Sequence, residues 1–298
     1  MEWLDDQAAV PFASWLRRAD EMLQAGESEA KAEAEMEKLT EEAPEHARAV
    51  ALIELLYRAG LFLAAFDRIE STGIADRKFD CLIRLGRIAE ANEWLWSRKA
   101  DATEEDAGKS EVGRLETDEW LCRLLLAPEK AQSLIGRLSS SFAVKLFERA
   151  VQLDIFPIAE PLLARSTDLL PYAKSLYRNG FVMRSAPIWI ALVENGKIDP
   201  EGYRSLGEIL YWRGVYGEAA SFFEYVWSLK PDDDKLRTQL MLANLRRSGK
   251  LLDDSMVLFP SSSFLREERR KVEEAIGRLE ASEPFPRWFG FERMRFHA

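Results

Sequence analysis

Glycine residues recur along this chain at intervals that match a repeated pair of helices. Gly26 and Gly60 are 34 residues apart. Gly180, Gly214 and Gly249 follow one another at intervals of 34 and 35 residues. Each of these glycines follows a stretch that favours helix, which is where a left-handed C-cap prefers glycine. The spacing restricts the chain to a helical-repeat architecture with a unit of about 34 residues.

The residues between the glycines have the composition and periodicity of short helices. Alanine, leucine, glutamate and arginine are abundant, and all four favour helix. Apolar residues recur at three- and four-residue spacing, as in Leu52, Ile53 and Leu56. Alternating runs of β-branched residues, which would indicate strands, are missing. We predict an all-α fold in which antiparallel helix pairs stack as an α-solenoid.

Residues 200–231 are the clearest copy of the unit. Gly207 on the first predicted helix allows the second helix to approach closely, and Ala219 supplies the matching small surface. Phe223 fills the space beside that contact, and Pro231 ends the unit because proline cannot continue a helix. Four residues form one packing stripe on the first helix: Tyr203, Leu206, Gly207 and Leu210.

This segment closely resembles the tetratricopeptide repeat family. Tyr203 stands where the family favours tryptophan, and Leu206-Gly207 matches the family's Leu-Gly pair. The neighbouring copies are degenerate, and in 235–260 we expect Gly249 to end one helix and Pro260 to end the next. The resemblance implies a right-handed superhelix whose first helices line a concave groove. The weaker copies are 12–44, 46–71, 72–98, 140–166, 166–199 and 235–260.

The predicted organisation has four parts. Residues 1–98 are degenerate helical repeats, and residues 99–114 are an acidic linker or loop. Residues 115–283 hold the tetratricopeptide-like repeats and end in a capping helix, and residues 284–298 are an aromatic and basic tail. The acidic segment either separates two arrays or is a long loop within one continuous superhelix. After it we expect helix to resume by Glu119.

Charge and composition exclude several classes of protein. Residues 1–120 hold 28 acidic and 15 basic side chains, and the whole chain has a net charge of −10. Such a balance argues against a nucleic-acid partner, since that binding is driven by phosphate neutralisation. The longest run without a charged residue, Ser255 to Leu265, is too short to span a bilayer. The acidic start does not resemble a secretory signal, so we expect a cytoplasmic protein.

The sequence offers no support for catalysis. Cys81 and Cys122 have no metal-ligand spacing, and neither His46 nor His297 belongs to a zinc motif. The acidic run 232–234 and the serine clusters 139–141 and 261–263 suit helix boundaries. We therefore expect no enzyme activity and no cofactor, with neither metal nor nucleotide needed for folding.

A binding surface is the remaining possibility. On the first helices, basic and aromatic side chains fall in the register that faces the groove, and such residues are common binding anchors. They would suit a protein or peptide segment that is acidic and carries apolar anchors; alternatively, the aromatic residues pack against neighbouring repeats. The candidate partner-binding residues are Lys174, Tyr177, Arg178, Arg204, Tyr211, Trp212 and Arg246.

The tail is the second unusual feature, with five aromatic residues between Pro284 and Phe296. It could cap the open end of the repeats, fold into the groove or bind a partner. The leading hypothesis is a non-catalytic scaffold that binds a protein or peptide partner. The alternatives are a peptide-responsive regulator like those of bacteria, or an accessory subunit of a larger enzyme such as a glycosyltransferase.

Overall fold

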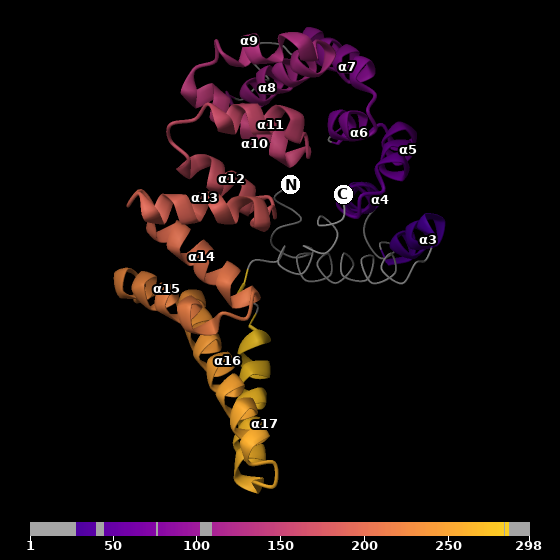
Figure 1. Ribbon diagram of the computed structural model, residues 1–298. Helices are drawn as coiled ribbons and strands as arrows, with labels where there is room; N and C mark the ends of the chain where they lie inside the picture. The colour runs from indigo at the N-terminus through magenta and orange to yellow at the C-terminus, as the bar shows by residue number, and fades with distance from the viewer. Residues whose placement is uncertain (1–27, 40–44, 76, 102–108, 283, 286–298) are drawn as a thin grey trace. The chain divides into compact units, whose positions relative to one another are not determined.

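The computed structural model describes residues 28–39, 45–75, 77–101, 109–282 and 284–285. Within these ranges the chain is helical with short turns, and no strand occurs (Figure 1). The all-α fold is therefore confirmed for the described part of the chain. Residues 1–27, which include Gly26, and the tail from residue 286 onward lie outside it, as does His297.

The chain forms two compact units, and the division between them falls between Thr167 and Asp168 in the sequence. Helices of the first unit are α3 (Glu29–Leu39), α4 (Glu45–Arg58), α5 (Phe62–Thr72), α6 (Lys78–Arg84), α7 (Ile88–Asp101), α8 (Lys109–Leu126), α9 (Ala131–Ile135), α10 (Ser140–Gln152) and α11 (Phe156–Ala164). A 3-10 turn at Pro128–Lys130 precedes α9.

Helices of the second unit are α12 (Leu170–Arg178), α13 (Val182–Glu194), α14 (Pro200–Trp212), α15 (Tyr216–Leu229), α16 (Asp234–Leu258) and α17 (Ser263–Glu280). In both units neighbouring helices pack as pairs, among them α4 with α5, α12 with α13, and α14 with α15. The paired helices predicted from the apolar periodicity are therefore present in the described residues.

The same type of backbone turn joins the two helices in each of five pairs. In each turn a residue with positive φ donates its N–H to the carbonyl three residues back, and the next N–H donates five residues back. This is the Schellman arrangement, which favours glycine. Gly60, Gly180 and Gly214 occupy the position as predicted, and Gly86 occupies it between α6 and α7, all with φ between 74° and 83°. Asp154, at φ 63°, occupies it between α10 and α11.

Gly86→Ala should lower the free energy of unfolding by about 1–2 kcal/mol, because a Cβ atom disfavours the left-handed region. No atom lies within 4 Å of a Cβ built there, so the backbone conformation alone carries the cost. Gly113→Ala is the matched control within helix α8, where alanine should stabilise by up to about 1 kcal/mol. Denaturant unfolding of both variants measures the two changes, and equal effects would contradict this account of the turn.

The helix pair α14–α15 contains the close contact expected within residues 200–231. A Cβ atom on Gly207 would lie 2.7 Å from Cε1 of Phe223, so glycine is required for the observed approach. Ala219 and Phe223 are both fully buried beside it. The predicted contact between Gly207 and the second helix is thus observed.

The residues predicted to form one packing stripe on α14 lie on two faces of the helix. Leu206 packs in a cluster with residues of α12 and α13. Tyr203 and Leu210 pack instead against the cluster formed by α15 and α16. The single stripe is therefore corrected: α14 lies between two neighbours and buries apolar side chains against both.

The repeat expected at 235–260 is wrong in its boundaries. Helix α16 runs without interruption from Asp234 to Leu258, and Gly249 is buried within it rather than ending a helix. A Cβ atom on Gly249 would contact Arg269 and Val272 of α17 at 3.6 Å. A glycine inside a helix costs about 1 kcal/mol, and packing along α17 offsets that cost. Figure 1 shows the resulting long α16–α17 hairpin.

Helix also extends into the acidic segment 99–114 from both sides. Helix α7 ends at Asp101, and α8 begins at Lys109, earlier than the expected Glu119. The two helices pack on each other within the first unit. Residues 102–108 between them lie outside the described ranges.

The capping roles predicted for the acidic and serine clusters are confirmed. Asp233 caps α16 by accepting the Leu236 N–H at 2.9 Å. Ser139 and Ser262 cap α10 and α17 in the same way. These side chains satisfy backbone donors that a helix start leaves unpaired. The last described helix is α17 (Ser263–Glu280), at the end of the segment where a capping helix is predicted.

Candidate functional site

The seven candidate partner-binding residues lie on the first helices of the pairs in the second unit. We call the surface formed by α12, α14 and α16 the first-helix face. Hydrogen bonds between side chains link these helices directly. The candidates are Lys174, Tyr177 and Arg178 on α12, Arg204, Tyr211 and Trp212 on α14, and Arg246 on α16.

The two cations of α12 are both paired with carboxylates at the start of α14. Lys174 Nζ lies 2.5 Å from Asp199 Oδ2 and 2.8 Å from Glu201 Oε2. Arg178 Nη2 lies 2.7 Å from the other oxygen of Glu201. Burial works against the charge of Lys174, but its two carboxylate partners leave its pKa raised above the ordinary value.

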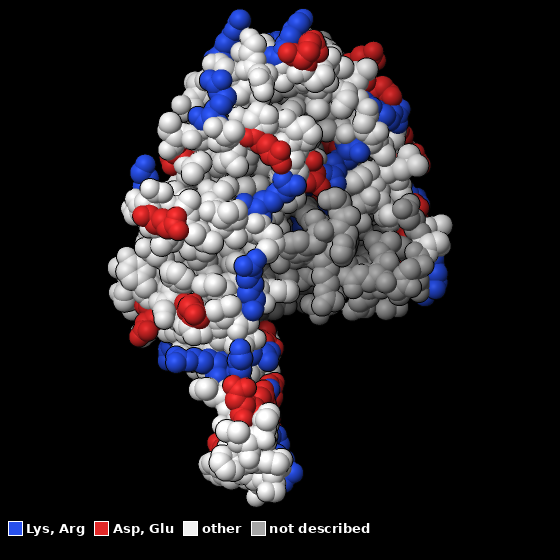
Figure 2. Space-filling view, viewed as in Figure 1, with Lys and Arg blue, Asp and Glu red and all other residues white. Residues whose placement is uncertain are grey.

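The candidate cations of α14 and α16, Arg204 and Arg246, are paired as well. Arg204 Nη1 lies 2.9 Å from Asp233 Oδ2, at the start of α16. Arg246 Nη2 lies 2.7 Å from Glu280 Oε1 at the end of α17. Lysine and arginine are interspersed with aspartate and glutamate over the described part of the surface in Figure 2. The positive character expected of the groove is therefore corrected, because carboxylates of the same unit neutralise these cations.

The three candidate aromatic residues differ in their burial. Tyr177 is 7% exposed and packs in the α12–α13 cluster, as the packing interpretation expected. Tyr211 is half-buried and lies edge-on to Tyr216, with ring centroids 5.4 Å apart. Trp212 is 49% exposed, so it is the candidate aromatic with most surface available to a partner.

A buried polar ladder crosses the first-helix face. The Tyr177 hydroxyl donates to Glu208 Oε2. Gln239 Nε2 donates to Glu208 Oε1 at 2.6 Å. Arg204 Nε donates to Gln239 Oε1 at 3.0 Å and contacts the Glu208 carboxylate at 3.3 Å. Glu208 and Gln239 are almost fully buried, so the ladder fixes how the three helices meet.

Neither Glu208 nor Gln239 is among the seven candidate residues. A signal for them exists, since Tyr177, Glu208 and Gln239 follow one another at intervals of 31 residues. Polar side chains at a constant interval on successive first helices can hydrogen-bond across the stack. That interval is shorter than the 34 residues between the glycines, so the glycine period does not locate these two side chains.

The start of the tail lies on the first-helix face. Gln239 Nε2 donates to the carbonyl oxygen of Pro284 at 2.9 Å, and this contact is buried. The ring of Phe285 stacks on Tyr211, with centroids 4.6 Å apart and planes 28° apart. These contacts place Pro284 and Phe285 against α14 and α16, while the choice among the three roles of the tail stays a prediction. Residues 286–298 lie outside the described part.

Burial raises the pKa of Glu208 above 4.5, against the lowering effect of Tyr177, Arg204 and Gln239. A carboxyl whose pKa is raised by folding stabilises the fold below its ordinary pKa, and that contribution is lost as pH rises through the raised value. The Glu208→Gln variant lacks this titration. The wild type should therefore lose stability relative to Glu208→Gln between about pH 4.5 and pH 8. Denaturant unfolding at both pH values tests this, and a constant difference would contradict it.

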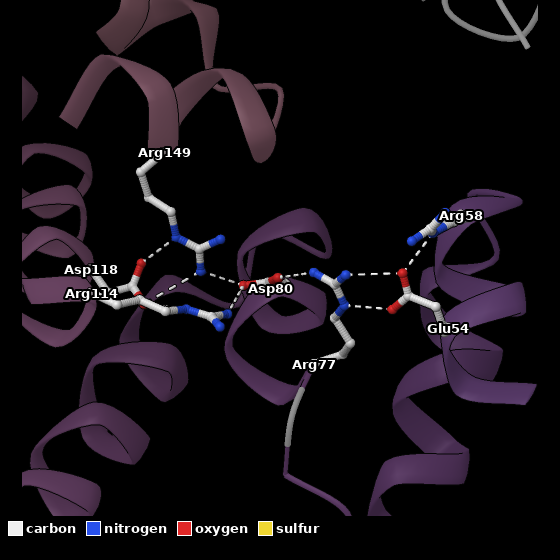
Figure 3. A network of polar contacts seen from close by, with 7 residues as sticks. All are labelled: Glu54, Arg58, Arg77, Asp80, Arg114, Asp118 and Arg149. Carbon is white, nitrogen blue, oxygen red and sulfur yellow. Dashed lines mark hydrogen bonds and ion pairs between the residues drawn. The ribbon is translucent and has the colours of Figure 1, made fainter. Parts of the chain in front are cut away.

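The first unit contains a second buried polar system, the ion network of Figure 3. Arg149 of α10 donates from Nε to Asp118 Oδ1 of α8 at 2.6 Å and from Nη2 to Asp80 of α6. Arg77 then joins Asp80, at 2.8 Å, to Glu54 of α4, at 2.7 Å. Two further arginines flank the network: Arg58 beside Glu54, and Arg114 beside Asp80 and Asp118.

Opposite charges alternate along this network, and its central members are buried. Asp80 is fully buried, and Arg149 is 7% exposed. Burial alone would raise the pKa of Asp80, but Arg149 and Arg77 hold it below 3.8. Burial outweighs Arg149 at Asp118, whose pKa is raised. Every carboxylate here is engaged by a guanidinium, so the network ties four helices together rather than presenting an acid–base pair.

A pocket of about 310 Å³ in the first unit lies beside α6, α8 and the α10–α11 turn. Its charged lining residues are Arg84 and Asp154, which pair with each other at 2.8 Å. Arg84 also donates to the carbonyl of Leu153 at 3.0 Å. The remaining lining is apolar: Ile83, Ile88, Leu125, Leu153, Ile155 and Pro157. The pocket is thus largely apolar, and its one ion pair joins α6 to the α10–α11 turn.

The described residues contain few reactive groups. Burial raises the pKa of both Cys81 and Cys122 to about 12, so neither is a thiolate near neutral pH. Within the described ranges, no three His, Cys, Asp or Glu side chains come together in a way that could hold a metal ion. Among the described helices, none has both the length and the apolar composition to cross a membrane.

Comparison of the chain with protein-family models, with curated proteins and with solved structures finds no match. Of the sites described above, the first-helix face is the one on which a non-helical peptide segment lies.

Proposed function

We propose that this chain is a non-catalytic helical-repeat scaffold that binds a peptide segment of a protein partner on the first-helix face. The proposal includes the tetratricopeptide resemblance, a right-handed superhelix with this face on its concave side, and a cytoplasmic location. The observation that carries it is the seating of Pro284 and Phe285 on Gln239 and Tyr211. A face that holds one peptide segment through a backbone carbonyl and an aromatic ring has the chemistry to hold another.

The structure changes the chemistry that we expect of the partner segment. Lys174, Arg178, Arg204 and Arg246 are each paired with carboxylates, which removes the reason to expect an acidic partner. Trp212 and Tyr211 supply aromatic surface on the same face. Aromatic anchors generally contribute more binding energy than exposed ion pairs. The proposed partner segment is therefore apolar and aromatic in its main contacts.

Site-specific photo-crosslinking in the native cell tests this function. A photoreactive phenylalanine analogue replaces Trp212 on α14 or Arg178 on α12, both exposed positions of the first-helix face. Ser221, exposed on the second helix α15, is the matched control. One protein should crosslink from both positions 178 and 212 and not from 221. Crosslinks that form equally from all three positions, or only from position 221, would contradict the proposal.

The alternative of an accessory subunit is favoured by a separate observation. The end of the α16–α17 hairpin exposes a cluster of large apolar side chains and is almost wholly white in Figure 2. Exposed clusters of this kind mark contact surfaces. The cluster comprises Val257, Leu258, Phe259 and Phe264, exposed by 80, 74, 62 and 69%.

Gel filtration of native cell extracts tests the accessory role. The double variant Phe259→Ser and Phe264→Ser should shift the chain from a large complex to its own size if the hairpin end holds it in an assembly. The Trp212→Ala variant, which lies on the first-helix face, should leave that complex intact. Elution of the wild type at the size of the single chain would exclude a permanent assembly.

A further inference from the structure

The Gln239 side chain is held in one orientation and donates a hydrogen bond to a backbone carbonyl. Its amide is fully buried. One N–H of Nε2 donates to Glu208 Oε1 at 2.6 Å, and the other donates to the Pro284 carbonyl at 2.9 Å. Its Oε1 accepts from Arg204 Nε at 3.0 Å, which sets the orientation of the amide. With Pro284 removed, a buried donor would lack its acceptor, and such donors are costly to leave unpaired.

The neighbouring part of the site recognises an aromatic ring. Phe285 stacks on Tyr211 and packs against the apolar cluster of α15 and α16. The Tyr211 hydroxyl lies 3.5 Å from Glu280 Oε1, so it is oriented from the end of α17. A peptide whose carbonyl acceptor directly precedes an aromatic residue can therefore contact both Gln239 and Tyr211.

Proline suits the first of the two positions. Pro284 is buried, and a buried residue must pair its backbone N–H or lack one. Proline has no N–H, so it presents only the carbonyl that Gln239 reads. The site thus selects a proline followed by an aromatic residue, rather than any extended backbone.

The described contacts of the segment come from two adjacent residues that follow the last described helix. Pro284 accepts a hydrogen bond from Gln239, and Phe285 packs on Tyr211 and on the apolar cluster of α15 and α16. Segments beyond the end of a helix can open locally without global unfolding. Opening uncovers the amide of Gln239 and the ring of Tyr211 together.

We propose that Gln239 and Tyr211 form a recognition site for a proline–aromatic peptide segment, which Pro284 and Phe285 occupy in cis until a partner displaces them. This inference rests on the proposed function and adds the chemistry of the partner segment and the control of its access. The partner competes with the chain's own segment, so its apparent affinity is reduced by the fraction of closed sites.

Fluorescence anisotropy with the full-length chain tests the exchange. The probe is a labelled peptide with the sequence of residues 281–287, ASEPFPR. The Phe285→Ala chain, whose cis segment is weakened, should bind this probe at least tenfold more tightly than the wild-type chain does. Phe264→Ala, the same change at an exposed position on α17, is the control and should bind as the wild type does.

A second probe tests the chemistry of recognition. A peptide of sequence ASEPAPR, which lacks the aromatic ring, should bind the Phe285→Ala chain at least tenfold more weakly than ASEPFPR. Adding Tyr211→Ala to the Phe285→Ala chain should weaken binding of ASEPFPR to a similar extent. Thermal melts of each variant report whether the second unit remains folded.

Three results would overturn the inference. They are equal binding of ASEPFPR to the wild-type and Phe285→Ala chains, equal binding of the two peptides, and loss of a cooperative melt in Phe285→Ala. The last result would make Phe285 part of the permanent core. The crosslinking experiment at positions 178 and 212 uses the native partner, so a partner found there would preserve the proposed function while this inference fails.

Discussion

Replacing Arg149 by methionine is expected to lower the free energy of unfolding by about 3–5 kcal/mol, because it leaves buried carboxylates without their counter-charge. Arg149 bridges Asp118 and Asp80, and all three side chains are buried. Methionine retains much of the side-chain volume, so the loss reports the charge rather than a cavity. Denaturant unfolding followed by circular dichroism measures the change.

Two further variants separate the charge from other causes. Lys145→Met makes the same kind of change on the exposed side of α10 and should alter stability by less than about 0.5 kcal/mol. In the triple variant, Asp80→Asn and Asp118→Asn accompany Arg149→Met and remove the unpaired charges. The triple variant should be more stable than Arg149→Met alone. A triple variant less stable than the single one would contradict the charge explanation.

The same network predicts a response to acid. The pKa of Asp80 is held below 3.8 in the folded chain, although burial opposes this, because Arg149 and Arg77 stabilise the ionised form. A lowered pKa gives stability that is present above the ordinary value and is lost as pH falls through the folded value. Below about pH 4 the stability difference between the wild type and Arg149→Met should therefore shrink. Unfolding measured at pH 3 and pH 7 checks this, and a difference that grows in acid would contradict it.

Gly207→Leu is expected to lower the free energy of unfolding by about 3 kcal/mol, at the upper end of the usual cost of overpacking. The reason is geometric, because a Cβ atom at this position would lie 2.7 Å from the ring of Phe223. Phe223 is fully buried, so its neighbours oppose a shift of the ring. Thermal and denaturant melts measure the loss.

Gly277→Leu on α17 is the matched control. No atom lies within 4 Å of a Cβ built at Gly277, and the residue is exposed. Leucine favours helix over glycine, so this variant should gain up to about 1 kcal/mol. A melt of Gly207→Leu that equals the wild type would mean that α14 and α15 do not meet at Gly207. The repeat assigned to residues 200–231 would then be lost.

The helical-repeat pattern was predictable wherever local sequence decides the backbone. Gly60, Gly86, Gly180 and Gly214 adopt the left-handed turn because they lack a Cβ atom, and the sequence locates them directly. Asp154 makes the same turn without that signal, since aspartate is among the few other residues that adopt this region. The turn between α10 and α11 therefore became visible only in the folded chain.

Prediction of the long α16–α17 hairpin needs the tertiary contacts between its two helices. Gly249 resembles the turn glycines in its spacing, yet it lies within α16 and faces Arg269 and Val272 of α17. A glycine is compatible with either a turn or a helix interior. The neighbouring helix decides between them, because packing along α17 outweighs the small intrinsic preference of one residue.

For the candidate site too, local sequence predicts some features, and contacts between distant segments decide the others. Periodicity placed all seven candidate residues on the first helices of the second unit, because helix register depends only on sequence spacing. It could not show that Lys174 and Arg204 pair with Asp199 and Asp233, since each pair joins segments 25 or 29 residues apart. Nor could it show which aromatic side chains stay exposed.

By itself, the sequence determined the all-α class, most of the turns, the helix caps and the helices that carry the candidate residues. Each of these depends on interactions within a few residues of chain. The tertiary structure alone decided the pairing of charges, the burial of Glu208 and Gln239, and the seating of Pro284 and Phe285 on the first-helix face. These depend on contacts between distant segments, whose energies act only once packing has brought the helices together.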